Sequence, residues 1–283
     1  MTITTEDNFQ VCPMTKDDLK IVLSWEVSEG FNPGIDDADN FYIADPGGFL
    51  IGKFNGKPIS CIAVVRYHPQ FNFIGHYIVK AEERKKGFGL KTWQEAWKLI
   101  DGQPAALNAV LEQVNNYQKF GFKPAHANFR YQGIIVGTIS PDVRDLKSID
   151  FEQLCCYDRQ YFPSHRSDFI STWINQPHGQ GYAIINDSDL VGYGVIRKAT
   201  DGFRIGPIFA ENENIAEKLL LALATYTEGS PIYVDVPNIN KSAILLFENY
   251  QMSPILECIA MYTAEPPNID WQKVFAVTSV ELG

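Results

Sequence analysis

Arg84-Lys85-Lys86-Gly87-Phe88-Gly89 is a basic turn with two glycines, which follows apolar Ile78-Val79 and precedes a run of helical character from Leu90 to Ile100. A strand that ends in such a turn and continues as a helix directs several backbone N–H groups at one point, where an anion can bind. Glycine has no Cβ and therefore reaches positive φ and permits close approach of a ligand. The three cations stand out in a chain of formal net charge −10. The stretch predicts a phosphate-binding site, with an ordinary surface turn as the alternative for so short a motif.

Composition limits the classes of protein to consider. The 283 residues suffice for two domains of about 140 residues, each able to bury its own core. A hydrophobic content of 45% with 13% aromatic residues is typical of a globular protein. The pI near 5.0 argues against nucleic acid as a partner and is compatible with a cationic substrate. We expect no membrane partner, because no apolar run approaches the roughly 20 residues that cross a bilayer.

The cysteines and the N-terminus indicate the compartment. Residues 1–10 are polar and acidic and carry no positively charged region before an apolar stretch, so we expect no secretory signal. The five cysteines are odd in number and lack C-x-x-C spacing. They predict buried thiols in a reducing compartment rather than disulfides or a zinc site. A cytoplasmic location is the resulting prediction.

The two halves of the chain repeat one order of elements. The first half predicts, in order, these segments: a helix at 19–27, a hairpin at 49–67, a turn at 68–70, a strand at 73–79, a helix at 90–100, a strand at 106–111 and a helix at 112–120. The second predicts a helix at 151–157, a hairpin at 181–198, a strand at 203–209, a helix at 215–226, a strand at 232–236 and a helix at 241–250. Matching landmarks recur at a steady offset (210 − 81 = 129; 247 − 117 = 130). An internal duplication with a boundary near 133–141 is the simplest explanation.

Two motifs resemble the GNAT superfamily of acyl-CoA-dependent N-acyltransferases. Residues 79–90 resemble its acyl-CoA pyrophosphate loop, and Tyr117-Gln118-Lys119-Phe120-Gly121-Phe122 resembles its Y-x-K-x-G-F element. A narrower resemblance, to tandem GNAT proteins with a divergent second half, includes Glu29 to Gly34 and Gly206-Pro207-Ile208. The resemblance implies an α/β protein (α+β mixed sheet) of two GNAT-like domains, each a twisted, mostly antiparallel sheet flanked by helices. Residues 1–135 would form the acyl-CoA-binding catalytic domain and 136–283 a divergent, non-catalytic one.

The same resemblance implies the chemistry. The chain would transfer an acyl group from acyl-CoA, with acetyl-CoA as the expected donor, to a primary amine. The transfer would pass through a tetrahedral intermediate and need no metal. Residues expected to bind the cofactor are Tyr77, Ile78, Val79, Arg84, Lys85, Lys86, Gly87, Phe88, Gly89 and Leu90. Tyr117 takes the position of the acid that stabilises the leaving thiolate. The alternative for Tyr117 is a half-buried tyrosine that packs on the preceding strand.

The acceptor side is less defined. The resemblance assigns acceptor recognition to Trp25, Glu29, Phe31 and Asn32, with Glu29 as partner of an ammonium group. No base is evident, because Phe73 stands where one version of the family has glutamate. His76 titrates in a useful range, but strand alternation places it on the opposite sheet face, so we expect a structural role. Water or Glu29 remain alternatives. The acceptor would be a small-molecule or lysine amine, and a homo-oligomer is left open.

The second half lacks the motif. Ala210-Glu211-Asn212-Glu213-Asn214 stands where the first half has its basic loop, and Phe247 replaces the tyrosine. Two carboxylates would repel a pyrophosphate, so acyl-CoA chemistry is not expected there. Polar Asp235, Asn238 and Asn240 are interpreted as turn and capping residues. A rival function for the whole chain is a non-enzymatic acyl-CoA sensor or interaction module.

Overall fold

The computed structural model describes residues 8–68 and 71–283, so most of the turn predicted at 68–70 lies outside the described residues. The strands are β1 Phe9–Pro13, β2 Phe49–Phe54, β3 Lys57–His68, β4 Phe71–Val79, β5 Ala105–Val110, β6 Lys123–Gly133, β7 Val143–Asp145, β8 Gly179–Asn186, β9 Asp189–Lys198, β10 Phe203–Ala210, β11 Ile232–Pro237, β12 Ser253–Tyr262 and β13 Val274–Ala276. The helices are α1 Lys16–Ser28, α2 Asp37–Ala44, α3 Phe88–Ile100, α4 Val114–Gln118, α5 Phe151–Asp158, α6 Ser167–Asn175, α7 Glu213–Ala224 and α8 Lys241–Asn249.

Local sequence explains several element boundaries. Thr15 and Asp18 form a reciprocal capping box that starts α1. Asn55 and Gly56 both adopt positive φ in the turn between β2 and β3, as the hairpin prediction required. The helix predicted at 112–120 is shorter than expected, because a 3-10 turn at Leu111–Gln113 precedes α4. The sequence pattern did not predict β1, α2, β7, α6, β12 or β13.

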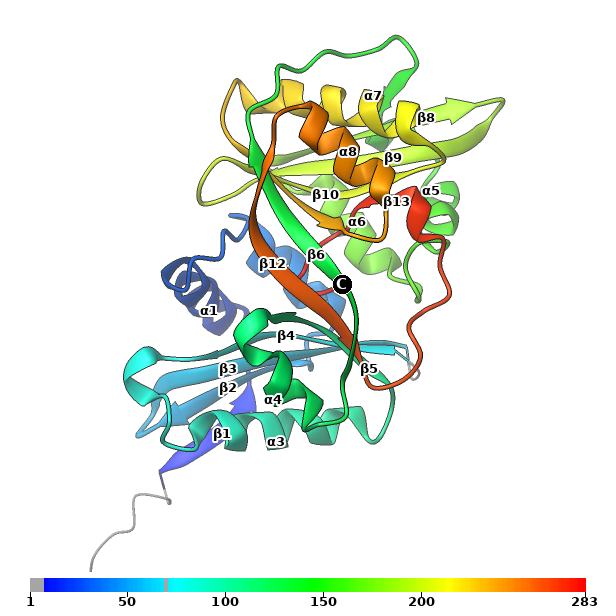
Figure 1. The fold of residues 1–283 in the computed structure, drawn as a ribbon. Coiled ribbons are helices and arrows are strands. Elements are labelled where there is room, and N and C mark those ends of the chain that lie inside the picture. Colours follow the sequence, from blue (N-terminus) through cyan, green and yellow to red (C-terminus); the bar gives the residue numbers. More distant parts are fainter. Residues whose placement is uncertain (1–7, 69–70) are drawn as a thin grey trace, which may run out of the picture.

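The two halves exchange their last strands. The order in the sheet is β1-β2-β3-β4-β5-β12-β6-β11-β10-β9-β8-β7, with β13 paired to β10. Strand β12 of the second half therefore pairs antiparallel with β5 of the first, and β6 of the first half pairs antiparallel with β11 of the second. Figure 1 shows β6 and β12 running side by side between the two lobes. A twisted mixed sheet flanked by helices confirms the predicted fold class.

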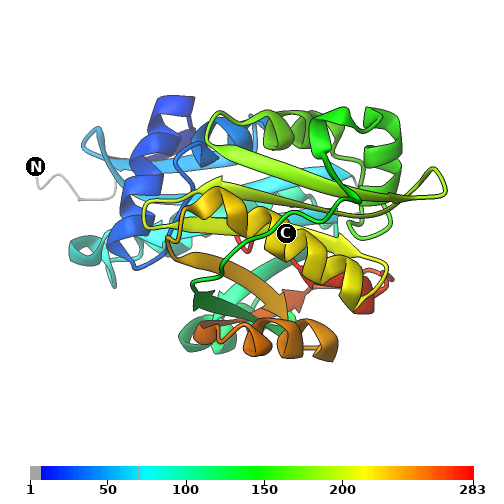
Figure 2. The same ribbon diagram turned by 90° about the horizontal axis from the view of Figure 1, so that it is seen from above.

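Side chains join the halves as well. The Phe41 ring of α2 stacks on Trp173 of α6 with 6.0 Å between centroids. Arg197 of β9 forms a buried ion pair with Asp37 of α2, with 2.8 Å between Nε and Oδ1. Helix α3 packs on the strands of the first half, while α7 lies over those of the second (Figure 2). One hydrophobic cluster thus contains residues from both halves.

Each half has a gap between two parallel strands. Strands β4 and β5 pair only where residues 72–74 face 105–107, and β10 and β11 pair only where 203–205 face 232–234. Beyond these pairs the strands separate. In the second half β13 enters the gap, because it pairs with β10 at Ile208 and Phe209, and the N–H of Val277 donates to the carbonyl of Asp235 in β11. In the first half the gap is bordered by two cavities.

Two further findings concern the compartment. No helix in the described part of the chain is both long and apolar enough to span a bilayer. All five cysteines are free thiols. Cys156 is exposed, so the expectation of buried thiols is wrong at that position.

Candidate acyl-transfer site

A β-bulge in β4 shapes the centre of the site. Cys61 of β3 faces Ile78, while Ala63 faces Gly75, so two residues of β4 oppose one of β3. His76 lies at the bulge with φ of +49°. Such an irregularity bends the strand and leaves one residue outside the regular ladder. The strand thereby turns away from β5 just before Tyr77.

A cavity of about 760 Å³, here called the outer cleft, follows the end of β4. It is lined by Glu29, Phe31, Tyr77, Ile78, Val79, Arg84, Lys85, Gly87, Gly89, Leu90, Val110, Glu112, Gln113, Asn116 and Tyr117. Most residues predicted to bind the cofactor therefore meet around one space, although Lys86 and Phe88 do not line it. Phe88 instead packs between Phe9 and Phe54, with ring centroids 4.9 and 5.1 Å away.

The backbone of the basic loop fits an anion at the start of α3. Gly87 is the N-cap residue, with φ of +87° and no side-chain cap. The first N–H groups of a helix have no partner within it, so they remain available to a phosphate group. Gly89 meets the strand closely, because a Cβ there would lie 2.8 Å from the Tyr77 hydroxyl. Only glycine gives the loop this conformation and this approach.

The basic side chains of the loop differ in their surroundings. Arg84 donates 2.8 Å to the carbonyl of Val79 and forms an ion pair with Glu29. Lys86 pairs with Glu83 at 3.0 Å and points its charge at the loop itself. Lys85 is exposed, with φ of +63°. The predicted acceptor residue Glu29 is thus on the cofactor side, where it holds Arg84.

A second cavity, here called the inner pocket, has a volume of about 120 Å³ and lies in the gap between β4 and β5. It is lined by Glu26, Phe31, Ile74, Gly75, His76, Tyr77, Ile78, Leu107, Asn108, Val110, Gln113, Tyr117, Cys258, Val280 and Glu281. The last three belong to the second half. Both halves therefore build this pocket, which the sequence pattern did not predict.

Tyr117 lines both the outer cleft and the inner pocket. Its ring packs on Trp93 and Phe122, with centroids 5.5 and 6.1 Å away. Burial raises the pKa of Tyr117 above the ordinary tyrosine value, and the nearby Tyr77 adds to the rise. The hydroxyl is therefore protonated at neutral pH and able to donate where the two cavities meet. Packing and an acid role are compatible for this side chain.

The other predicted acceptor residues are dispersed. Phe31 lines both cavities. Asn32 exchanges two hydrogen bonds with the backbone of Asp201, at 2.7 and 2.8 Å, and so joins the loop after α1 to the second half. Trp25 lies under Lys80, whose Nζ is 5.1 Å from the ring centroid. Trp25 lines neither cavity.

A buried ion network lies behind the inner pocket. Asp235 accepts from Arg130 at 2.8 and 2.9 Å and from Arg204 at 2.8 Å. Arg204 also donates 2.8 Å to Glu281. The prediction that Asp235 is a turn or capping residue is therefore wrong, because it is a buried strand residue between two arginines. Asn240 does cap α8, accepting 3.0 Å from the N–H of Ala243.

In the second half, the loop between β10 and α7 takes the place of the basic loop, and contacts within that half hold it. Asn212 caps α7 by accepting 3.1 Å from the N–H of Ile215. Glu211 accepts 2.9 Å from the Tyr161 hydroxyl and 2.6 Å from Lys273. These contacts and β13 occupy the region that corresponds to the outer cleft.

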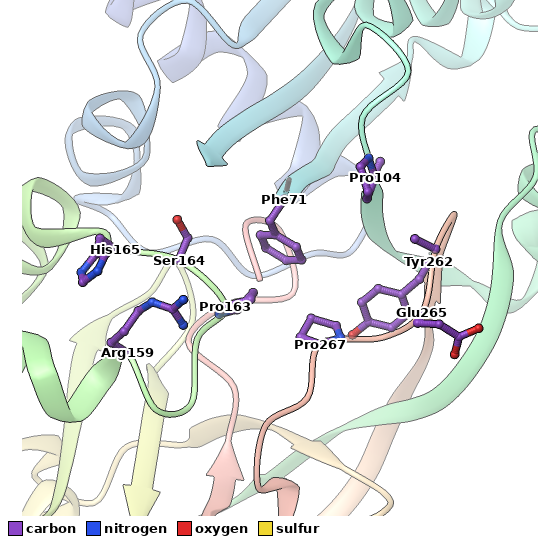
Figure 3. A pocket seen from close by; sticks show the side chains of 11 residues that line it. Phe71, Pro104, Arg159, Pro163, Ser164, His165, Tyr262, Glu265 and Pro267 are labelled. Atoms are coloured by element: carbon purple, nitrogen blue, oxygen red, sulfur yellow. The ribbon is translucent and has the colours of Figure 1, made fainter. Parts of the chain in front are cut away.

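A third cavity, of about 420 Å³, lies at the other ends of β4 and β5 (Figure 3). Its charged side chains Arg159 and Glu265 are exposed and lie on opposite sides of the cavity. It shares no residue with the inner pocket. Among the described residues, no three His, Cys, Asp or Glu side chains gather closely enough to hold a metal ion.

Comparison with known proteins finds similar acyltransferases. A model of the acetyltransferase (GNAT) domain matches residues 154–276, in the second half. The whole chain is similar to the holothin acyltransferase of Pseudoalteromonas sp. (strain SANK 73390), with 28% identity over 274 residues, 96% of this chain and 93% of that protein.

Solved structures have the same fold. A putative acetyltransferase from Pyrococcus horikoshii superposes with a TM-score of 0.84 at 18% identity, covering 100% of this chain and 99% of the other. A tandem GNAT protein from the clavulanic acid biosynthesis pathway gives 0.64 at 12% identity, covering 92% and 100%. The second half thus matches a GNAT acetyltransferase domain, and the chain as a whole has the fold of a tandem GNAT protein, in agreement with the resemblance of its two motifs.

Proposed function

We propose that the first half of this chain transfers an acyl group from acyl-CoA, with acetyl-CoA as the donor, to a primary amine. The observation that carries the proposal is the meeting of two cavities at Tyr117: an outer cleft beside a glycine-containing helix start, and an inner pocket within the strand gap. A thioester bound in the first would present its carbonyl to an amine in the second.

Separate groups of the site are proposed to bind the cofactor, stabilise the oxyanion and protonate the leaving thiolate. N–H groups at the start of α3 would hold the pyrophosphate, while the free edge of β4 at Tyr77 to Val79 would hold the pantetheine arm by backbone hydrogen bonds. A strand N–H at the bulge is the candidate donor to the oxyanion. Tyr117 would donate a proton to the thiolate as it leaves. Acyl-CoA supplies the activated acyl group.

The acceptor is proposed to be a small-molecule amine rather than a lysine side chain. The inner pocket of about 120 Å³ is narrow. A relative that matches 96% of this chain is named a holothin acyltransferase, which supports acyl transfer by this chain too.

We further propose that the second half does not bind acyl-CoA. Support comes from β13 in its strand gap and from Glu211, whose carboxylate is held by Lys273 at the place where a pyrophosphate would lie. Its role would be to complete the inner pocket through Cys258, Val280 and Glu281.

Calorimetric titration with acetyl-CoA and CoA tests the site, using Gly87→Glu and the matched control Gly102→Glu. Both glycines are exposed, have positive φ and would have free space around a Cβ, but Gly102 lies at the other end of α3. We expect one site per chain, abolished by Gly87→Glu and retained by Gly102→Glu. Equal binding by both variants would place the cofactor elsewhere. Binding without thiol release on an amine panel would favour the sensor function.

A further inference from the structure

Glu26 of α1 and His76 of β4 form a buried ionisable pair at the inner pocket. The His76 Nδ1 and Glu26 Oε1 atoms are hydrogen-bonded. Their side chains are 0% and 3% exposed. Burial of a carboxylate and an imidazole is costly unless each is paired, so the contact explains why both are tolerated.

Each group keeps one polar atom without a partner. Within residues 8–68 and 71–283, Glu26 Oε2 and His76 Nε2 are buried and have no hydrogen bond. Buried polar atoms are nearly always satisfied, and an exception at a cavity points to water, ligand or catalysis. Both residues line the inner pocket, as does Tyr117. The unfilled hydrogen-bonding capacity is therefore at the proposed acceptor site.

The bulge explains why His76 is where alternation did not expect it. With φ of +49° at His76, the simple up-and-down pattern of β4 is interrupted. The Cys61 thiol donates 3.0 Å to the His76 carbonyl from β3. The imidazole thus sits among the rings of Phe41 and Phe49, with centroids 5.4 and 6.0 Å away, and against Glu26.

Charged groups around the pair come from several elements. Burial lowers the pKa of His76, but the Glu26 carboxylate and its hydrogen bond outweigh this, so the net pKa is raised from its ordinary 6.5. Asp37 of α2 and Glu281 add in the same direction, although each is itself paired with an arginine. Cys61 stays neutral, because burial raises its pKa well above its ordinary value. The imidazole is therefore a stronger base than a free one.

We propose that the Glu26–His76 pair accepts the proton that the acceptor ammonium must lose before it attacks the thioester. The assignment rests on the proposed function. The ammonium gives one proton to the pair. Its nitrogen then bonds to the thioester carbon and the carbon–sulfur bond breaks. Tyr117 gives its hydroxyl proton to the leaving thiolate and regains a proton from the second one that nitrogen loses. The pair finally releases its proton to water.

The test compares two acceptors in wild type and Glu26→Gln, which keeps the size of the side chain and a hydrogen bond to His76. One acceptor is the best alkylamine of the panel, protonated at neutral pH, and the other is the alkoxyamine (R–O–NH2) with the same alkyl group, which is neutral there. We expect kcat/KM to fall at least 100-fold for the alkylamine, in the range for a lost acid–base group. The alkoxyamine should lose less than tenfold, because it needs no deprotonation before it attacks.

Glu29→Gln is the matched control, the same chemical change three residues further along. Because Glu29 holds Arg84 on the cofactor side, its removal should affect the two acceptors equally. If Glu26→Gln also reduced kcat/KM equally for both acceptors, Glu26 would have only a structural role and the inference would be overturned. Acetyl-CoA affinity and Tm, measured for each variant, show whether the fold is retained.

NMR titration of the imidazoles gives a readout without turnover. His76 should titrate above 6.5 in wild type and below it in Glu26→Gln. A wild-type His76 that keeps one protonation state between about pH 5 and 9 overturns the inference even if the variant fails to fold. Absence of turnover by wild type with acetyl-CoA bound would overturn the proposed function and this inference with it, whereas wild-type turnover with equal losses overturns only the inference.

Discussion

Asn108 of β5 donates a hydrogen bond of 3.0 Å to the carbonyl of Val280, which fastens the segment 277–283 of the second half beside the strand gap of the first. Asn108 in turn accepts 2.9 Å from Asn128 of β6. A Cβ at Gly75 would collide with the carbonyl oxygen of Glu281, so the segment lies directly against β4. The wall of the inner pocket thus depends on contacts between residues far apart in the chain.

Glu281→Gln should destabilise the whole molecule. The substitution leaves Arg204 and Arg130 buried with Asp235 as their remaining carboxylate. Loss of one partner from a buried ionic cluster costs about 3 to 5 kcal/mol. Urea unfolding measures this, with Glu95→Gln, from the exposed Lys98–Glu95 pair, as control. A free energy of unfolding equal to that of wild type would mean that water reaches the network.

Acid should weaken the fold through the same network. Burial alone would raise the pKa of Glu281, but Arg204 and Arg130 outweigh burial and hold it far below its ordinary 4.5. Between the two pKa values the unfolded chain binds more protons, so stability is lost as pH falls below about 4.5. The free energy of unfolding, measured from about pH 6 to pH 3, should decline less steeply in Glu281→Gln. Parallel curves would exclude Glu281 as a source of the decline.

Gly89→Ala should weaken CoA binding through Tyr77. The added Cβ would lie 2.8 Å from the Tyr77 hydroxyl, which forces the loop or the ring to shift. In Gly89→Ala/Tyr77→Phe that hydroxyl is absent, so part of the affinity should return. Calorimetry on both single variants and the double variant gives the coupling between the positions. Additive effects would show that the added carbon does not act through the Tyr77 hydroxyl.

The sequence predicted those parts of the site whose geometry is local. Gly87 and Gly89 lie within one strand-turn-helix unit, and Tyr117 lies on the next short helix, so their motifs fix their relative placement. The repeated order of elements also predicted two units of one kind, because helices and strands of the first half have counterparts in the same order in the second. The fold class followed from the family resemblance that the two motifs carry.

Long-range pairing was not predictable in the same way. Nothing in the pattern of β12 indicates that it pairs with β5 rather than with its own half, since either sheet would bury it. Glu26 lies within the amphipathic α1, where a buried carboxylate cannot be distinguished from an exposed one without its partner. Strand alternation predicts the wrong sheet face for His76. The bulge in β4 shifts the alternation at this residue, and no feature of the sequence marks the bulge.

Tyr117→Phe should lower kcat about 10²-fold or more, while the affinity for acetyl-CoA changes little. The ring would still pack on Trp93, so only the proton donor between the two cavities is lost. A thioester whose thiol leaves more readily should lose less, because the donor matters most for a poor leaving group. Rates of thiol release for both thioesters, beside calorimetry for the affinity, measure this. Equal turnover by variant and wild type would leave Tyr117 a packing residue and move the acid to water or to Tyr77, whose pKa burial raises to about 12.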